Sequence, residues 1–137
     1  VRMARTERIF TLLPAAPGEA YVQHFLQYYR DDIQKYFTGT ETSLTQADTA
    51  FLVCCDAVPV GLLIGRTLEQ SSLEVFLDYS TPQYRDCSVG QYLYQQLAER
   101  GCRRLMVPTA SQVHGAYLKK MGFIQENGRY VKDLASN

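Results

Sequence analysis

The stretch PQYRDCSVG, from Pro82 to Gly90, is the most informative segment of the sequence. It joins residues 71–80, which are rich in strand formers, to residues 89–100, which have helical periodicity. In such a turn the backbone N–H groups and the positive end of the following helix bind phosphate without basic side chains. Glycine is usual there because it accepts positive φ and lets a ligand approach the backbone closely. Gly90 is the one glycine here, so the stretch predicts a phosphate-binding turn of altered shape.

The pattern on both sides of this turn predicts one mixed α/β domain spanning residues 1–137. Asn127-Gly128, near the C-terminus, is the strongest short signal for a β-hairpin. The predicted strands span residues 8–15, 50–55, 59–68, 71–80 and 103–109, the predicted helices span residues 19–37, 89–100 and 111–121, and residues 38–50 form a polar loop. The order is therefore strand, helix, a meander of three strands, helix, strand, helix and hairpin.

The composition is that of a globular domain without a strong electric field. Hydrophobic residues make up 46% of the chain and charged residues 20%, and 14 basic side chains balance 14 acidic ones. This balance gives no reason to expect nucleic-acid binding. We find no apolar run long enough to span a membrane and no signal peptide, so we expect no membrane contact and a cytoplasmic location. The first residue is valine, which leaves open that the chain is a piece of a longer protein.

The cysteines and histidines do not form a pattern that predicts a metal site. The 4 cysteines occupy positions 54, 55, 87 and 102 without a C-x-x-C pair, and the 2 histidines lie far apart in sequence. Residues 54 and 55 are adjacent and would point to opposite faces of a strand. We therefore expect no metal, and the free thiols favour a reducing compartment.

Two segments of the chain carry a resemblance to a known family. One is the P-x-Y-R turn between the third meander strand and a helix. The other is AYLKKMGFIQENGRYV, residues 116–131, which is similar to a Y-x-K-x-G-F run followed by a terminal hairpin. In this order they resemble the GNAT superfamily, the Gcn5-related N-acetyltransferases, over residues 51–131 and more loosely over the first helix. The resemblance implies a central, mostly antiparallel sheet flanked by helices, and transfer of an acetyl group from acetyl-CoA to an amine.

The resemblance also implies where the cofactor binds. The family's pyrophosphate turn, Q/R-x-x-G-x-G/A, corresponds here to Arg85-x-x-Ser88-x-Gly90, and the carboxylate of Asp86 is unfavourable beside a pyrophosphate unless it points to solvent. In the family a bulge splays the preceding strand, whose backbone holds the pantetheine arm and the thioester carbonyl. The implied cofactor-binding residues are Leu77, Asp78, Tyr79 and Ser80 on the strand, Arg85, Asp86, Cys87, Ser88, Val89 and Gly90 in the turn, and Ser111 on the later helix. The alternative is an ordinary strand-to-helix turn in which Arg85 is a solvated charge.

Acyl transfer to an amine needs one group that accepts the amine proton and another that protonates the leaving thiolate. Glu74 lies where histone-acetylating members of the superfamily carry a general-base glutamate; the alternative is that it points to solvent. The family's thiolate acid corresponds to Leu118 here, so Tyr117 is the candidate acid, although one helical step rotates its side chain by about 100°. The alternative for Tyr117 is packing in the core. We expect His114 to be a surface residue and Cys87 a turn residue rather than a nucleophile.

Two hypotheses about function follow from these residues. The first is an acetyl-CoA-dependent N-acetyltransferase in which an amine of a small molecule or peptide attacks the thioester directly in a ternary complex. The second is a GNAT-like module that binds CoA, or regulates, with weak or no turnover. Leu118, Asp86 and the missing turn glycines favour the second. The identity of the acceptor and the oligomeric state, a dimer included, are left open by the sequence.

Overall fold

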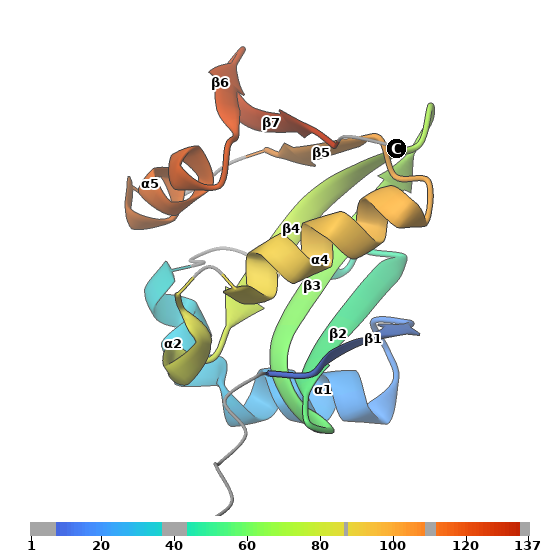
Figure 1. The fold of residues 1–137 in the computed structure, drawn as a ribbon, viewed down its shortest axis with the longest axis vertical. Helices are drawn as coiled ribbons and strands as arrows, with labels where there is room; N and C mark the ends of the chain where they lie inside the picture. Colours follow the sequence, from blue (N-terminus) through green and yellow to red (C-terminus); the bar gives the residue numbers. More distant parts are fainter. Residues whose placement is uncertain (1–7, 37–43, 87, 109–111, 135–137) are drawn as a thin grey trace, which may run out of the picture.

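A seven-stranded sheet forms the centre of the structure, a computed structural model that describes residues 8–36, 44–86, 88–108 and 112–134. The strand order is β1-β2-β3-β4-β5-β7-β6, and only the β4–β5 pair is parallel (Figure 1). The strands are β1 (Phe10–Ala15), β2 (Thr49–Cys55), β3 (Val58–Leu68), β4 (Ser72–Ser80), β5 (Arg104–Val107), β6 (Ile124–Glu126) and β7 (Arg129–Asp133). The predicted mixed α/β fold with a mostly antiparallel central sheet is confirmed.

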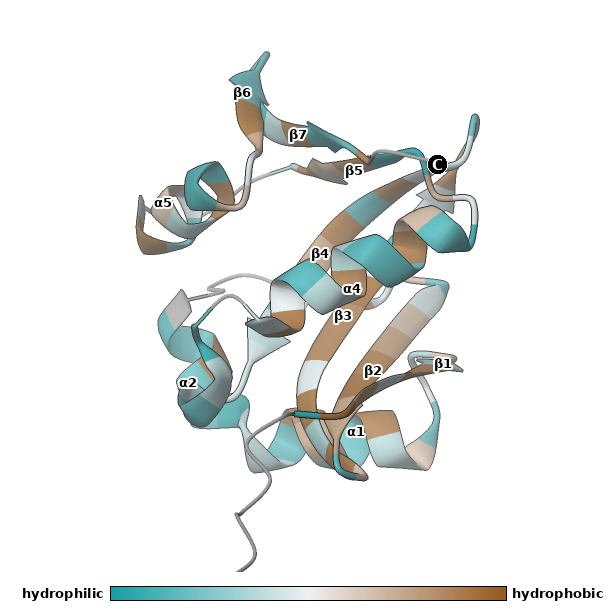
Figure 2. Ribbon diagram, in the orientation of Figure 1, coloured by the Kyte–Doolittle hydropathy of each residue, from teal (hydrophilic) through white to brown (hydrophobic). Residues whose placement is uncertain are grey.

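Helices cover both faces of this sheet, and each face has its own hydrophobic core. The helices are α1 (Ala20–Tyr28), α2 (Arg30–Tyr36), α4 (Ser88–Glu99) and α5 (Gln112–Lys120), with a short 3₁₀ helix at Pro82–Tyr84. Leu93 and Leu97 of α4 and Leu118 of α5 pack on one face, whereas Val22 and Phe25 of α1 pack on the other. Figure 2 shows hydrophobic residues along β2, β3 and β4, and hydrophilic residues on the outer side of α4.

Tight turns connect β2 to β3 and β3 to β4 in the meander, and β6 to β7 in the C-terminal hairpin. The two-residue turns at Asp56-Ala57 and Asn127-Gly128 have positive φ at both central residues, as in the type I′ turns that suit the right-handed twist of paired strands, whereas three residues, 69–71, connect β3 to β4. The φ values are 51° and 72° at Asp56 and Ala57, 60° and 60° at Gln70 and Ser71, and 53° and 80° at Asn127 and Gly128. The predicted meander and the predicted hairpin at Asn127-Gly128 are therefore confirmed.

The first helical segment differs from its prediction. A single helix over residues 19–37 is wrong, because α1 ends at Tyr28 and α2 begins at Arg30. Tyr29 between them has φ −102° and ψ 16°, outside helical values. Within the described ranges, no helix is long and apolar enough to cross a membrane.

Candidate active site

The candidate active site lies where β4 and β5 separate. The two strands pair only over Ser72 to Glu74 of β4, opposite Arg104 to Met106 of β5. Beyond Glu74 the strands diverge (Figure 1), and among the described residues no strand pairs with this edge of β4. Backbone N–H and C=O groups along the edge are therefore open to an extended ligand, as at any unpaired strand edge.

A β-bulge lies at the start of this open edge. Ile64 of β3 pairs with Leu77, whereas the next residue, Gly65, pairs with Val75, so Phe76 is an extra residue in β4. The bulge reverses the faces of β4: Val75 belongs to the core under α4, and Leu77 to the core under α1 and α2. The bulge expected from the family resemblance is therefore present.

Because of this reversal, Asp78 points toward α4. The hydroxyl of Tyr94 on α4 donates a hydrogen bond of 2.6 Å to Asp78 Oδ2. Asp78 keeps some exposed surface, but its carboxyl group is enclosed by protein, and this burial raises its pKa to about 6. Burial also raises the pKa of Tyr94, with Asp78 and the hydroxyl of Tyr117 as further contributors. Asp78, Tyr94 and Tyr117 thus form one group of polar side chains beside the open edge of β4.

The sequence alone did not identify the side chain of Asp78 as a candidate. Simple alternation places it on the same face as Glu74, because the two residues are four apart. The extra residue Phe76 moves it to the opposite face. Gly65, opposite the bulge, is the one nearby residue type consistent with this reversal, because a Cβ at position 65 would overlap the carbonyl oxygen of Glu74.

Glu74 lies on the face of β4 opposite to Asp78 and forms an ion pair with Arg66. Its Oε1 accepts a hydrogen bond of 2.6 Å from Arg66 Nη2, and the Glu74 side chain is 15% exposed. Arg66 also lies over the ring of Phe76 at 5.9 Å, and its Nε has no hydrogen-bond partner among the described residues. The solvent-facing alternative for Glu74 is therefore wrong, and any role as a base requires the carboxylate to work beside a guanidinium.

A side chain of the protein itself occupies the turn that the sequence predicts to bind phosphate. Asp86 Oδ1 accepts hydrogen bonds from the backbone N–H of Ser88 at 3.1 Å and from its hydroxyl at 2.6 Å. Arg8 Nη1 donates to Asp86 Oδ2 at 2.7 Å and to Ser88 Oγ at 2.8 Å. These partners, the Ser88 hydroxyl first, lower the pKa of Asp86 to about 2. The carboxylate thus takes the place at the start of α4 where a phosphate oxygen would bind.

Arg85 is folded back against β4 and α2. Its Nε donates a 3.0 Å hydrogen bond to the carbonyl oxygen of Ser80, and its Nη2 forms an ion pair with Asp32. The Tyr79 hydroxyl donates to the same carboxylate oxygen of Asp32, and the Arg85 guanidinium lies over the Tyr79 ring at 5.3 Å. Arg85 is therefore ion-paired but still exposed, and the alternative of an ordinary strand-to-helix turn with a surface charge stays open. Val89 and Gly90, which complete the turn, are buried in the first turn of α4.

On α5 the neighbouring positions 117 and 118 have different surroundings. Leu118, in the position of the family tyrosine, is 0% exposed and lies in the core. Tyr117 reaches α4, because a Cβ on Gly90 would overlap its hydroxyl. The ring of His114 stacks on Tyr117 at 6.0 Å and 17°, and His114 is only 6% exposed. The expected surface position of His114 is therefore wrong; burial lowers its pKa to about 4, so it is neutral at pH 7.

Two predicted site residues, Cys87 and Ser111, lie outside the described residues. Across the parts of the chain that the structure describes, no three His, Cys, Asp or Glu side chains converge as a metal site requires.

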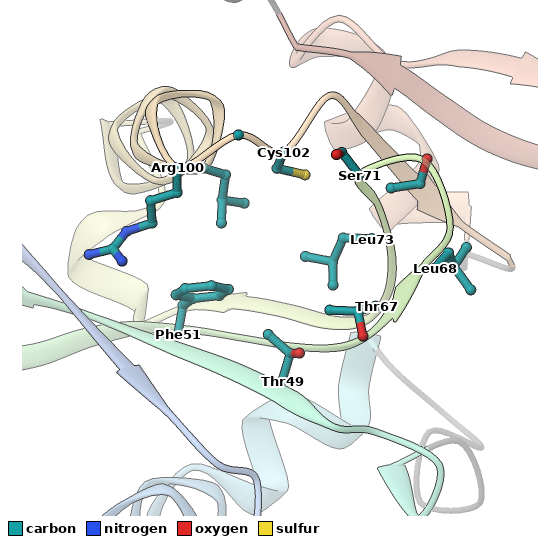
Figure 3. Close-up of a pocket in the computed structure, with 11 residues that line it drawn as sticks. Thr49, Phe51, Thr67, Leu68, Ser71, Leu73, Arg100 and Cys102 are labelled. Atoms are coloured by element: carbon teal, nitrogen blue, oxygen red, sulfur yellow. The ribbon is translucent and has the colours of Figure 1, made fainter.

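A separate pocket of about 250 Å³ lies at the other end of α4 (Figure 3). Phe51, Leu73 and Leu97 give it a mainly apolar lining, and Arg100 and Cys102 lie at the end of the helix. Since α4 has 12 residues, its ends are roughly 18 Å apart, so this pocket is distant from the turn at Ser88. It is not part of the candidate active site.

Solved structures similar to this one cover nearly the whole chain. They include the Escherichia coli protein YhhK, named as an N-acetyltransferase and bound to coenzyme A, with a TM-score of 0.64 and 15% identity over 91% of this chain and 98% of that one. The acetyltransferase from Salmonella typhimurium that modifies the N-terminal serine of ribosomal protein L7/L12 has a TM-score of 0.59 and 17% identity over 91% and 96%. The catalytic domain of Tetrahymena Gcn5 histone acetyltransferase, with coenzyme A, has a TM-score of 0.59 and 13% identity over 96% and 94%.

These matches define the fold of the chain. Protein-family models and curated proteins give no match to its sequence. The structural neighbours share the GNAT acyltransferase fold, and this chain has the same fold. The superfamily resemblance expected from the sequence is thus confirmed at the level of the fold, while identities of 13% to 17% leave the activity to be proposed from the site.

Proposed function

We propose that this protein is an acetyl-CoA-dependent N-acyltransferase that acetylates a primary amine of a peptide or small molecule. The observation that carries the proposal is the open edge of β4 beyond Glu74, next to the bulge at Phe76. The pantetheine arm of CoA contains two amide groups, which can pair with such an edge as an added strand does. Coenzyme A is bound in two of the neighbours that share the fold, which supports a ligand of this class.

The proposed reaction is direct attack of the neutral amine on the thioester carbonyl carbon. A C–N bond forms, the C–S bond breaks, the amine loses one proton and the thiolate gains one. Asp78 is the proposed proton acceptor, because its carboxyl group adjoins the open edge and its pKa of about 6 is near that of an efficient general base. Tyr94 and Tyr117 offer a path by which a proton returns to the thiolate. Glu74 stays a second candidate base, limited by its pairing with Arg66.

The test measures thiol release from acetyl-CoA over a panel of amines and peptide N-termini. Asp78→Asn keeps an oxygen acceptor for Tyr94 but cannot accept the proton, so we expect turnover to fall by roughly a hundredfold or more. Glu74→Gln should have a much smaller effect. Asp133→Asn is the matched control, because that carboxylate is 74% exposed on β7. Unchanged turnover in Asp78→Asn contradicts its role, and absence of CoA binding at millimolar concentration contradicts the whole proposal.

The second candidate function is a CoA-binding module without turnover. The observation that favours it is the occupation of the turn by Asp86, together with Leu118 in the core at the position of the family acid. Calorimetry and the thiol-release assay separate the two functions. Binding of CoA without thiol release from any amine supports the module.

The acceptor class is proposed from the neighbours. One neighbour is named as modifying the N-terminal serine of ribosomal protein L7/L12, and another as a ribosomal-protein-S18-alanine N-acetyltransferase from Escherichia coli. These names support including peptide N-termini in the amine panel, beside small-molecule amines.

A further inference from the structure

We propose that Asp86 and Asp32 compete with the cofactor pyrophosphate for the turn, so that these two carboxylates set a weakened affinity for CoA. The inference rests on the proposed function, because it concerns the same cofactor site. It goes further in naming the residues that limit binding of the phosphate-bearing part of the ligand. Both carboxylates already hold the groups that a pyrophosphate would use.

Asp86 occupies the helix end. Its Oδ1 lies 3.1 Å from the backbone nitrogen of Ser88, the first residue of α4, and 2.6 Å from the Ser88 hydroxyl. Arg8 fixes the other carboxylate oxygen at 2.7 Å. An oxygen of a bound phosphate needs the same N–H group, and two anions cannot share one donor without strong repulsion. The Asp86 side chain is 52% exposed, so it is free to rotate into solvent when a ligand displaces it.

Asp32 forms an ion pair with the guanidinium of Arg85. The Arg85 Nη2 pairs with Asp32 Oδ2, which also accepts the hydrogen bond from Tyr79. Lys35 Nζ lies 3.9 Å from the second oxygen of Asp32. The Tyr79 hydroxyl, followed by Arg85, lowers the pKa of Asp32, so this carboxylate is ionised at neutral pH. Arg85 is thereby held on α2 rather than directed at the start of α4.

The charge balance at the turn follows from these pairs. Arg8 pairs with Asp86, and Arg85 shares Asp32 with Lys35, so each guanidinium at the turn already has an anionic partner. Removing the Asp86 carboxylate leaves the guanidinium of Arg8 without its anionic partner, beside Ser88. A pyrophosphate then gains both the donor and an attractive charge, whereas a ligand without phosphate gains neither.

The test is calorimetric titration of CoA and of pantetheine, which lacks phosphate, into the parent protein and Asp86→Asn. The amide oxygen introduced by this substitution would still accept the hydrogen bond from Ser88, so the change removes charge with little change in shape. We expect the affinity for CoA to rise about tenfold and the affinity for pantetheine to stay the same. Glu69→Gln is the control, because it removes the same charge from an exposed residue after β3. Asp32→Asn should raise CoA affinity in the same direction as Asp86→Asn.

The outcomes separate this inference from the proposed function. If CoA binds the parent protein, Asp86→Asn and Glu69→Gln equally, the competition is refuted while the cofactor site stands. Weaker binding to Asp86→Asn also refutes the competition, because it makes Asp86 a supporting residue of the turn. If no variant binds CoA, both the inference and the proposed function fail. Thermal unfolding of each variant, with and without CoA, identifies any loss of folding.

Discussion

The carboxyl group of Asp78 makes the stability of this fold depend on pH in a defined window. Burial raises its pKa from 3.8 to about 6, so the folded state binds this proton more tightly than the unfolded chain does. The difference of about 2 pH units corresponds to roughly 3 kcal/mol. This stabilisation is complete below the unfolded pKa of 3.8 and is lost as the pH rises through about 6. At neutral pH the ionised carboxylate therefore costs at most about 3 kcal/mol.

Asp78→Asn removes this dependence and keeps an acceptor for Tyr94. We expect the variant and the parent protein to have similar free energies of unfolding near pH 4. Toward neutral pH the variant should become more stable, by at most about 3 kcal/mol. The same substitution removes the proposed base, so the more stable variant should be the less active one, as is common when an active site is strained.

Urea unfolding followed by circular dichroism, at intervals from about pH 4 to about pH 8, measures the difference. The chain has 0 tryptophans, so tyrosine fluorescence is the second probe. Taking variant minus parent cancels the other titrating groups, including Asp86 with its lowered pKa. The control Asp133→Asn should show no stabilisation that grows between pH 4 and neutral pH. Parallel profiles for Asp78→Asn and the parent protein would refute the assigned burial of this carboxyl.

Three further substitutions test the packing around the site by urea unfolding. Leu118→Tyr puts a larger side chain into a fully buried position, so the free energy of unfolding should fall by about 1–3 kcal/mol and thiol release should not rise. Equal stability would mean that position 118 has room for the family tyrosine. Gly65→Ala places a methyl group against a carbonyl oxygen of β4 and should cost about 1–3 kcal/mol, whereas Gly18→Ala, with open space around it, should not. Tyr79→Phe removes the hydrogen bond to Asp32 and should cost about 1 kcal/mol; no change would show that this bond adds nothing.

Local patterns predicted most of the sheet because its turns are encoded locally. Asn127-Gly128 and the short connection after Cys55 have the φ values that two-residue hairpins require. The break at Tyr29 was missed because the apolar spacing continues across it. Phe25 and Ile33 are both buried on the same face of the sheet, although they belong to different helices. Hydrophobic periodicity reports which side chains are buried, and it does not report a change in backbone direction.

The strand, turn and helix that carry the candidate site were predicted, but the contacts of their side chains were not. The frame from Arg85 to Gly90 identified the turn, since strand, turn and helix follow one another along the chain. The partners of that turn, Arg8 and Asp32, lie 78 and 53 residues away from Asp86 and Arg85, so no local pattern reveals them. His114 was misplaced for a similar reason. Its burial depends on Tyr117 and on the packing of α5 against the sheet.

Phe76, as the extra residue, sets which face of the sheet each later residue of β4 occupies. Deleting it would leave a strand of nearly the same length, yet every residue from Leu77 to Ser80 would exchange faces. Leu77 and Tyr79 would leave the core under α1 and α2, and Asp78 would leave Tyr94. A substitution in this strand changes the contacts of one side chain, whereas a change of one residue in its length would disrupt both cores and the candidate site at once.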